Sequence, residues 1–182
     1  ISIKLQNIFM IDIIFPKLHQ EGYKFLVISS AVTFILFLVS SFLGSVSFII
    51  TIWVYYFFRD PERYPINDDS YLTSPADGVI SQIVEVEGPR DLGLENKKFT
   101  RVSIFMNVFN CHVNRTPSSG KINKIFYKPG KFFNASLDKA SIDNERNYVS
   151  MVDNNGEDLV LVQIAGLVAR RIVCNVQEND KL

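Results

Sequence analysis

The sequence predicts a mostly-β domain, a β-sandwich or flattened barrel with an internal repeat, preceded by a membrane-embedded helical hairpin. One supporting observation is a long stretch without charged residues, Phe25–Phe58. A second is a series of short runs rich in Val, Ile and Phe after Arg59, separated by turn residues. The third is a turn-and-strand pattern that occurs twice in this later part. Hydrophobic residues make up 47% of a chain that is also 21% charged, so they must be concentrated in particular segments.

The uncharged stretch Phe25–Phe58 is predicted to lie in a membrane, because charged side chains are costly in lipid and such stretches exclude them. A single helix of this length would extend about 50 Å, whereas the hydrocarbon core of a bilayer is about 30 Å thick. Gly44 and three serines within Ser40–Ser45 interrupt the stretch near its middle. We therefore expect a helical hairpin, either spanning or re-entrant, in preference to a buried hairpin of a soluble protein.

The charges beside the hairpin predict its orientation. Lys17 and Lys24 precede it, and Arg59 and Arg63 follow it. The positive-inside rule therefore puts both ends, and the domain that follows, on the cytoplasmic side. Residues 1–24 form a separate N-terminal segment, whose weak amphipathic pattern suits the bilayer surface.

Charge and cysteine usage argue against several classes of protein. The 19 basic and 19 acidic residues cancel, so the basic excess expected for a nucleic-acid partner is missing from the composition. Cys111 and Cys174 provide neither a disulfide framework nor the spacing of a metal site, and no metal is predicted.

Residues 59–182 are predicted to form one mostly-β domain. It opens with a polar linker, Arg59–Ser70, whose prolines and aspartates disfavour regular structure. Beyond the linker, no stretch of ten or more residues shows a strong helical period. The predicted strands are Gly78–Val86, Phe99–Met106, Lys121–Tyr127, Tyr148–Val152, Leu159–Ile164 and Leu167–Val173.

The internal repeat relates Ser74–Ile80 to Thr116–Ile122. Both segments read (S/T)-P-x-x-G-x-I, and both have another Ile three residues further on. A turn opened by Pro and closed by Gly, followed by an alternating strand, is expected in each. Two related β-units would produce this pattern, and a chance similarity of two turns is the alternative.

Few side chains of the β domain are suited to chemistry. Asp77 lies in the first repeated turn, where turn formation alone would also explain an aspartate. His112 is the only imidazole of this domain, so any acid–base catalysis by histidine near neutral pH must use it. Arg170 and Arg171 are adjacent and suit a phosphate, although a solvated strand end is equally compatible with them.

Five motifs occur in order between about Tyr56 and Val173. They are FFRDPER, SPADG, HVNRTP, FFNASLDKAS with NERN after it, and QIAGLVARRIV. In this order they resemble the phosphatidylserine decarboxylases, most closely the short bacterial and archaeal branch of that family. The chain is similar to the large subunit of those enzymes.

The resemblance implies a proenzyme that breaks a Gly-Ser bond and converts the serine into a pyruvoyl group on a small subunit. That group accepts the electrons released when phosphatidylserine loses CO2 and becomes phosphatidylethanolamine. The implied partners are the small subunit, phosphatidylserine and the membrane, with a homodimer left open, and the implied location is the bacterial inner membrane. Gly44-Ser45 lies inside the hairpin, so the pyruvoyl serine is expected beyond Leu182.

The resemblance also assigns roles to residues. Asp77 matches the SPADG aspartate, which is associated with activation of the serine for self-cleavage. His112 matches the first histidine of an H-x-x-H-x-P pattern in longer members, where two histidines divide self-cleavage and decarboxylation. Here Arg115 occupies the second position, so the step that His112 serves stays open. Arg115, with Asn114 and Arg170, is predicted to bind substrate, and a structural ion pair is the alternative for Arg115.

Two other classes of protein are alternatives to the enzyme. Asp138-Lys139-Ala140 imitates the hairpin that presents lipoyl-lysine, and the repeated strands suit a lipoyl or biotinyl carrier domain. A non-catalytic membrane-anchored scaffold would fit if the gene lacked the Gly-Ser site. The enzyme is favoured, because a carrier domain needs neither the hairpin nor the HVNRTP and ARRIV segments. A partial likeness of fold to such carriers is still expected.

Overall fold

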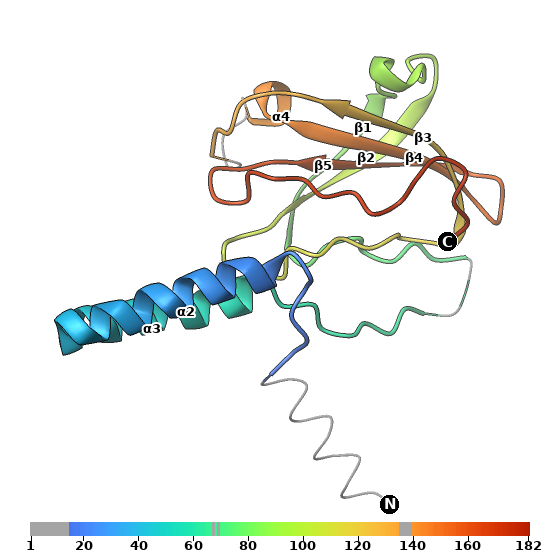
Figure 1. Ribbon diagram of the computed structural model, residues 1–182. Coiled ribbons are helices and arrows are strands. Elements are labelled where there is room, and N and C mark those ends of the chain that lie inside the picture. The colour runs from blue at the N-terminus through green and yellow to red at the C-terminus, as the bar shows by residue number, and fades with distance from the viewer. Residues whose placement is uncertain (1–14, 67, 69, 135–139) are drawn as a thin grey trace, which may run out of the picture. The chain divides into compact units, whose positions relative to one another are not determined.

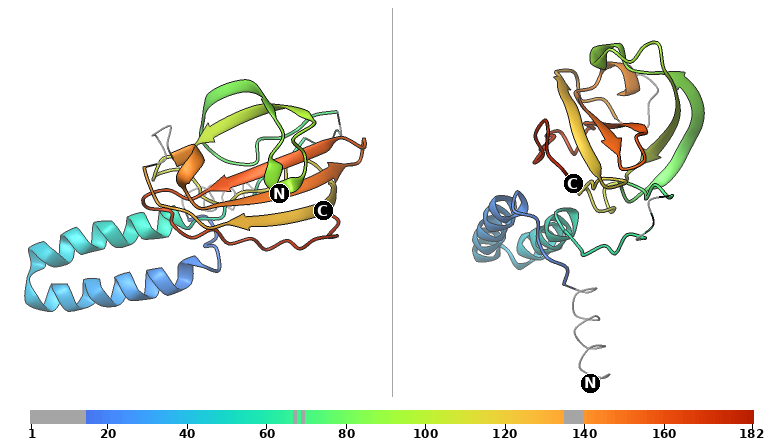
Figure 2. Two further views of the ribbon diagram at one scale, coloured as in Figure 1. Left: turned by 90° about the horizontal axis from the view of Figure 1, so that it is seen from above. Right: turned by 90° about the vertical axis from the view of Figure 1, so that its right-hand side faces the viewer.

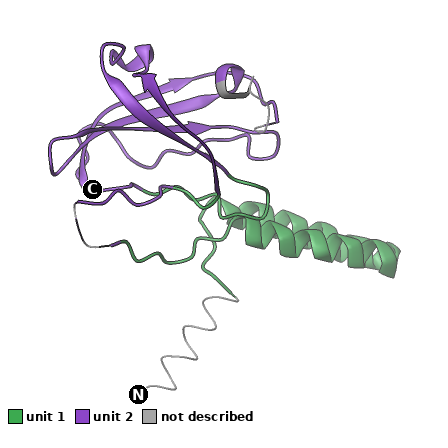
Figure 3. Ribbon diagram, turned by 180° about the vertical axis from the view of Figure 1, so that it is seen from behind, with its two compact units in different colours: residues 1–65, 76–78, 106–115 green, residues 66–75, 79–105, 116–182 purple. Residues whose placement is uncertain are grey.

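The computed structural model describes residues 15–66, 68, 70–134 and 140–182, so most of the predicted surface segment 1–24 lies outside the described residues. The chain divides into two compact units (Figure 3). Unit 1 comprises residues 1–65, 76–78 and 106–115, and unit 2 comprises residues 66–75, 79–105 and 116–182. Unit 1 contains two long helices and unit 2 contains antiparallel sheets (Figure 1), which confirms the predicted class of N-terminal helices followed by a mostly-β part.

The helical hairpin consists of α2 (Gly22–Val39) and α3 (Ser41–Phe57), joined by Ser40 alone. Ser40 ends α2 because its backbone is extended, with φ −160° and ψ 131°. Its N–H still donates to Leu36 O at 2.8 Å, and the N–H of Gly44 donates to Ser40 O at 2.9 Å. The predicted interruption within Ser40–Ser45 is confirmed, and each helix is about 26 Å long at the usual rise per residue.

The two helices pack through small and hydroxyl-bearing side chains. The buried hydroxyl of Thr33 hydrogen-bonds Ser47 Oγ at 2.8 Å and Thr51 Oγ1 at 2.9 Å. Gly44 lies against Phe37, whose ring would be 2.3 Å from a Cβ at that position, so the close approach requires glycine. Within the described part of the chain, α2 is the helix that is both long and apolar enough to cross a membrane, and α3 is apolar but shorter.

Backbone hydrogen bonds join the two ends of the hairpin. Leu18 and Arg59 form an antiparallel bridge, and His19 N–H donates to Phe58 O at 2.9 Å. The chain therefore enters and leaves the hairpin side by side.

Unit 2 contains two antiparallel sheets. The smaller sheet pairs β1 (Val79–Glu87) with β2 (Lys98–Phe105), and the 3₁₀ helix η1 (Arg90–Leu92) lies in their connection. The larger sheet has the order β3-β4-β5. Its strands are β3 (Gly120–Lys128), β4 (Arg146–Asp153) and β5 (Asp158–Ile164), and the short helix α4 (Ala140–Asp143) precedes β4. The β1–β2 ribbon curves over one face of the larger sheet (Figure 2).

The hydrophobic core of unit 2 lies on one face of the larger sheet. Ile122, Val149 and Met151 are buried there. The residues that pack against them are Ile125, Leu159, Leu161 and Val176. A buried aliphatic side chain contributes about 1.5–3 kcal/mol, so this cluster fixes the three strands and the segment around Val176 together.

Both repeated turns lead into a strand that is bulged at the corresponding place. The pairing register shifts between Ile80 and Gln82 in β1, and between Ile122 and Lys124 in β3. In each strand the extra residue is the third after the glycine of the motif. The repeat seen in the sequence therefore extends to the backbone, because each bulge falls between the two isoleucines of its motif.

The prediction of a strand over Leu167–Val173 is wrong. This stretch turns back on itself, because Gly166 N–H donates to Ala169 O at 2.9 Å and the side chain of Arg170 donates from Nε to Leu167 O at 3.0 Å. The other predicted strands are confirmed, with ends that differ by one or two residues.

The C-terminal residues extend the larger sheet beside β3. Gly120 and Leu182 exchange backbone hydrogen bonds of 3.1 and 2.9 Å, and Ile122 N–H donates to Asp180 O at 2.9 Å. The β3 side of the sheet is therefore paired further, whereas among the described residues β5 pairs with β4 alone.

Candidate active site

The structure distributes the predicted site residues over both units. Asp77, His112, Asn114 and Arg115 belong to unit 1, and Arg170 belongs to unit 2. Unit 1 therefore contains the acid–base candidates together with the helical hairpin.

An asparagine turn precedes His112 and fixes its backbone. The side chain of Asn107 accepts a hydrogen bond from Phe109 N–H at 2.8 Å, and the side chain of Asn110 accepts one from Asn107 N–H at 2.8 Å. Asparagine side chains commonly close turns in this way, because their carbonyl oxygen replaces a backbone acceptor.

The same loop is bound to the end of α3. Trp53 Nε1 donates to Val108 O at 3.2 Å, and an Arg59 guanidinium N–H donates to Phe109 O at 2.9 Å. Cys111 is buried, and its Sγ lies 3.2 Å from Arg59 O as a thiol donor. Within unit 1, the chain before His112 is thus anchored to the chain that leaves the hairpin.

His112 is half-buried, and its ring stacks on Phe57 with centroids 4.3 Å apart. Burial lowers the pKa of His112 below its ordinary value of 6.5, and the nearby Arg59 charge lowers it further. A hydrogen bond with Asn110 opposes this shift. The imidazole is therefore mostly neutral at pH 7.

The hydrogen bond of His112 also defines which nitrogen carries the proton. Its Nδ1 lies 3.0 Å from Asn110 O. Because a carbonyl oxygen only accepts, Nδ1 must be the donor, which leaves the lone pair of the neutral ring on Nε2. A neutral imidazole with a basic Nε2 is suited to removing a proton and returning it.

Asp77 lies in the SPADG turn, as predicted, and its carboxylate is paired with Arg63. The Nη2–Oδ2 distance is 2.5 Å, and both side chains are partly exposed. The turn positions the backbone of Asp77, and Arg63 orients the carboxylate.

Arg115 forms the ion pair that was the alternative to substrate binding. Its Nη2 lies 2.5 Å from Asp60 Oδ1 and 2.8 Å from Pro61 O. About a third of each side chain is exposed, so the pair stays accessible to solvent. The two roles are compatible, because Nη2 makes both contacts while the guanidinium carries further N–H groups.

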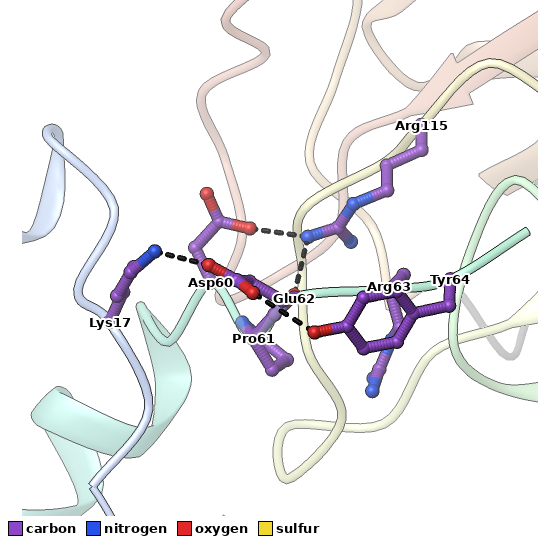
Figure 4. A pocket seen from close by; sticks show the side chains of 7 residues that line it. All are labelled: Lys17, Asp60, Pro61, Glu62, Arg63, Tyr64 and Arg115. Atoms are coloured by element: carbon purple, nitrogen blue, oxygen red, sulfur yellow. Dashed lines mark hydrogen bonds and ion pairs between the residues drawn. The ribbon is translucent and has the colours of Figure 1, made fainter. Parts of the chain in front are cut away.

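A pocket of about 360 Å³ lies beside this ion pair (Figure 4). It is lined by Lys17, Asp60, Pro61, Glu62, Arg63, Tyr64 and Arg115. Lys17 pairs with Glu62, and hydrogen bonds from Lys17 and Tyr64 lower the pKa of Glu62 below its ordinary value. Three cations and two carboxylates therefore surround the pocket.

Asn114 and Arg170 are the remaining predicted binding residues. Asn114 Nδ2 lies 3.7 Å from Met106 Sδ. The Cζ atom of Arg170 lies 5.8 Å from the ring centroid of Phe132, and its Nε donates to Leu167 O within the same turn. Within the described part of the chain, His, Cys, Asp and Glu side chains form no group of three that could hold a metal ion.

Sequence reasoning did not assign Phe57, Asp60 and Arg63 to the site. All three lie in FFRDPER, which directly follows the hairpin. From the sequence, Arg63 is explained by membrane orientation and the aspartates of Arg59–Ser70 by the linker. An ion pair is the alternative for Arg115, but the sequence predicts neither its partner nor the contacts of Asp77 and His112. The Asp138-Lys139 pair of the carrier alternative lies outside the described residues.

Comparison with known proteins identifies the family. The phosphatidylserine decarboxylase family model matches residues 50–182. The phosphatidylserine decarboxylase proenzyme of Pelagibacter ubique is 62% identical over 173 residues, which cover 95% of this chain and 80% of that protein. The proenzyme of Ruegeria pomeroyi is 52% identical over 173 residues, which cover 95% of this chain and 79% of that protein. The proenzyme of Rickettsia typhi is 52% identical over 170 residues, which cover 93% of this chain and 73% of that protein.

A mostly-β fold after an apolar helical hairpin is the arrangement that the sequence predicted. The chain belongs to the phosphatidylserine decarboxylase family.

Proposed function

We propose that this chain is the larger part of a self-processing enzyme that converts phosphatidylserine into phosphatidylethanolamine and CO2. The observation that carries this proposal is family membership, with proenzyme relatives 52–62% identical over most of the chain. A proenzyme name implies cleavage into subunits, so a small subunit is the expected partner. A homodimer is compatible with this arrangement and stays a prediction.

The proposed cofactor is a pyruvoyl group formed from a serine of the small subunit. When present, it supplies an electron sink for the charge left on the carbon that loses CO2. Forming it requires a base near a serine hydroxyl, and using it requires a proton donor near the product carbon. Unit 1 offers a carboxylate, Asp77, and a neutral imidazole, His112, so these residues fit such a group.

We assign Asp77 to activation of the serine for self-cleavage. A hydroxyl is a weak nucleophile until a neighbouring base accepts its proton. The carboxylate of Asp77 is held in a turn and oriented by Arg63 at 2.5 Å, which supports a fixed position for it. Arg63 is then a positioning residue for Asp77.

We assign proton transfer to Nε2 of His112. The Asn110 carbonyl holds the proton on Nδ1, and burial against Phe57 favours the neutral ring. In this state Nε2 accepts a proton from a hydroxyl, and the resulting imidazolium returns one to carbon. Self-cleavage, decarboxylation, or both remain open for this residue.

We place the anionic head group of the lipid at the pocket beside Arg115. The cations Lys17, Arg63 and Arg115 line it, and a planar guanidinium offers paired donors to a phosphate or carboxylate. Asp60 then holds Arg115 in position between substrates. Asn114 and Arg170 are kept as further candidates for binding the substrate.

The hairpin is the proposed membrane anchor. Most of its outward side chains are apolar, including Leu38 and Phe42, each about three-quarters exposed. We propose three regions: a surface segment over residues 1–24, an embedded hairpin over 25–58, and a catalytic domain over 59–182. Flanking lysines and arginines support a cytoplasmic position for the catalytic domain at a bacterial inner membrane. A partly lipoyl-like sandwich is proposed for that domain, on the strength of the repeated turn, strand and bulge.

The decisive experiment uses the product of the whole gene. Purified protein is analysed by intact mass and then assayed for CO2 release from carboxyl-labelled phosphatidylserine. We expect two fragments, the smaller with a blocked N-terminus, and release that stops when a hydride reagent reduces the pyruvoyl carbonyl. A single uncleaved chain without CO2 release would contradict the proposal.

A further inference from the structure

Arg146 is a buried cation with an unused hydrogen-bond donor. It lies on β4, in unit 2, and only 8% of the residue is exposed. Its Nε donates to Asn144 O at 3.2 Å, and its Nη1 donates to Tyr148 Oη at 3.3 Å. Its Nη2 is buried without a hydrogen-bond partner among the described residues.

The charge of Arg146 is also unpaired within the described part of the chain. A guanidinium stays protonated in proteins, so it cannot escape burial by losing its charge. A buried charge is costly unless a counter-charge accompanies it. Lys128, opposite Arg146 on β3, already pairs with Asp91 of η1 at 3.0 Å. Arg146 therefore still lacks a counter-charge among the described residues.

The strand next to Arg146 is incompletely covered on the same face. Ile164 lies opposite Arg146, and Val162 lies opposite Tyr148, so these side chains share one face of the sheet. Ile164 is 40% exposed and Val162 is 42% exposed. Among the described residues only β4 pairs with β5, so the side of β5 that faces away from β4 is an open sheet edge within this part of the chain.

We propose that a segment of the small subunit docks along the open edge of β5 and supplies a carboxylate to Arg146. The inference rests on the proposed cleavage into two subunits. A strand edge with exposed aliphatic side chains fits a polypeptide, which offers backbone donors and acceptors together with apolar side chains. A lipid head group would satisfy only the cation. The matched segment covers 80% of the Pelagibacter ubique proenzyme, so that relative has further chain that could occupy such an edge.

The first test compares R146M with R101M in the full proenzyme. Met keeps the unbranched stem and removes the charge. Arg101 is the matched control, because it is an exposed strand arginine whose contact is Gln82 Oε1 at 2.9 Å. In R146M, we expect the small fragment to dissociate at a urea concentration lower by roughly 1 M, because the carboxylate is left unpaired. R101M should dissociate like the wild type.

The second test needs no variant. Hydrogen exchange of the intact wild-type protein reports whether the outer amides of β5 are bonded, and we expect them to exchange as slowly as those of β4. Exchange as fast as in exposed loops would overturn the proposal, and so would equal urea midpoints for R146M and R101M. If R146M instead raises the KM for phosphatidylserine with an unchanged midpoint, the anion belongs to the substrate and the proposal is wrong.

These outcomes are separable from failure of the proposed function. A wild type that never cleaves would contradict the function. In that uncleaved chain the same segment would be covalently attached, so slow exchange at β5 and destabilisation by R146M alone would still support the docking.

Discussion

The imidazole of His112 stacks on the ring of Phe57, the last residue of α3, with centroids 4.3 Å apart and planes inclined by 26°. The proposed proton-transfer residue therefore packs against the end of the proposed membrane anchor, both within unit 1. The hairpin therefore provides a packing surface for the His112 ring in addition to its proposed role as an anchor.

Phe57→Ala should move the acid limb of the pH–rate profile to higher pH. Burial lowers the pKa of His112, so the neutral, basic form persists below pH 6.5 in the wild type. Removing the ring hydrates the imidazole and raises its pKa toward about 6.5, so activity is lost earlier as the pH falls. The measurement is kcat/KM between pH 5 and 8. Phe109→Ala, which removes an exposed ring from the same loop, is the control, and an identical limb in both variants would contradict this reading.

Asp77→Ala should leave most of the proenzyme uncleaved, because the serine hydroxyl loses its base. Arg63→Gln should slow cleavage without abolishing it, since the carboxylate remains but is no longer oriented. The fraction cleaved over time, read by intact mass, separates the two. Asp91→Ala is the control, because it removes another ion-paired carboxylate from η1. Normal processing and turnover in Asp77→Ala would remove Asp77 from the site.

Arg115→Lys should raise the KM for phosphatidylserine by roughly tenfold while self-cleavage stays intact, since the charge remains and the paired donors are lost. Asp60→Asn is the matched variant, because it breaks the ion pair and keeps the guanidinium. A partly exposed pair contributes only about 0.2–1 kcal/mol, so both variants should melt within a few degrees of the wild type. Unchanged KM in Arg115→Lys and Arg115→Gln would exclude substrate binding.

Replacing residues 22–56 with a short Gly-Ser linker should release the protein from the membrane fraction. The replacement keeps Phe57, and the linker is geometrically possible because Leu18 and Arg59 are bridged at the base of the hairpin. We expect turnover of short-chain phosphatidylserine in micelles and a large loss on bilayers. Unchanged partition into membranes would mean that the anchor lies elsewhere.

Most of the secondary structure could be predicted because local signals were strong. The serines near Gly44 marked the interruption of the hairpin, and turns with Pro and Gly marked the starts of β1 and β3. The strand predicted over Leu167–Val173 failed because its apolar composition matches a strand, whereas its backbone bonds close a turn.

The partners of the site residues could not be predicted in the same way. Their chemistry and the family motifs predict Asp77 and His112 as site residues, but Arg63 and Phe57 contact them only after the chain folds back. Such long-range contacts leave no local pattern. The burial of Arg146 could not be predicted from the sequence either, since burial of a guanidinium depends on the strands around it.

The hydroxyl cluster of Thr33, Ser47 and Thr51 has a consequence for biosynthesis. During translation α2 emerges from the ribosome before α3, which carries both hydroxyl partners of Thr33. A lone α2 would expose this hydroxyl to lipid without its partners on α3, whereas the completed pair buries it. We therefore expect the helices to enter the bilayer together, after α3 has emerged, so that the nascent chain is tethered before the strands of the larger sheet leave the ribosome.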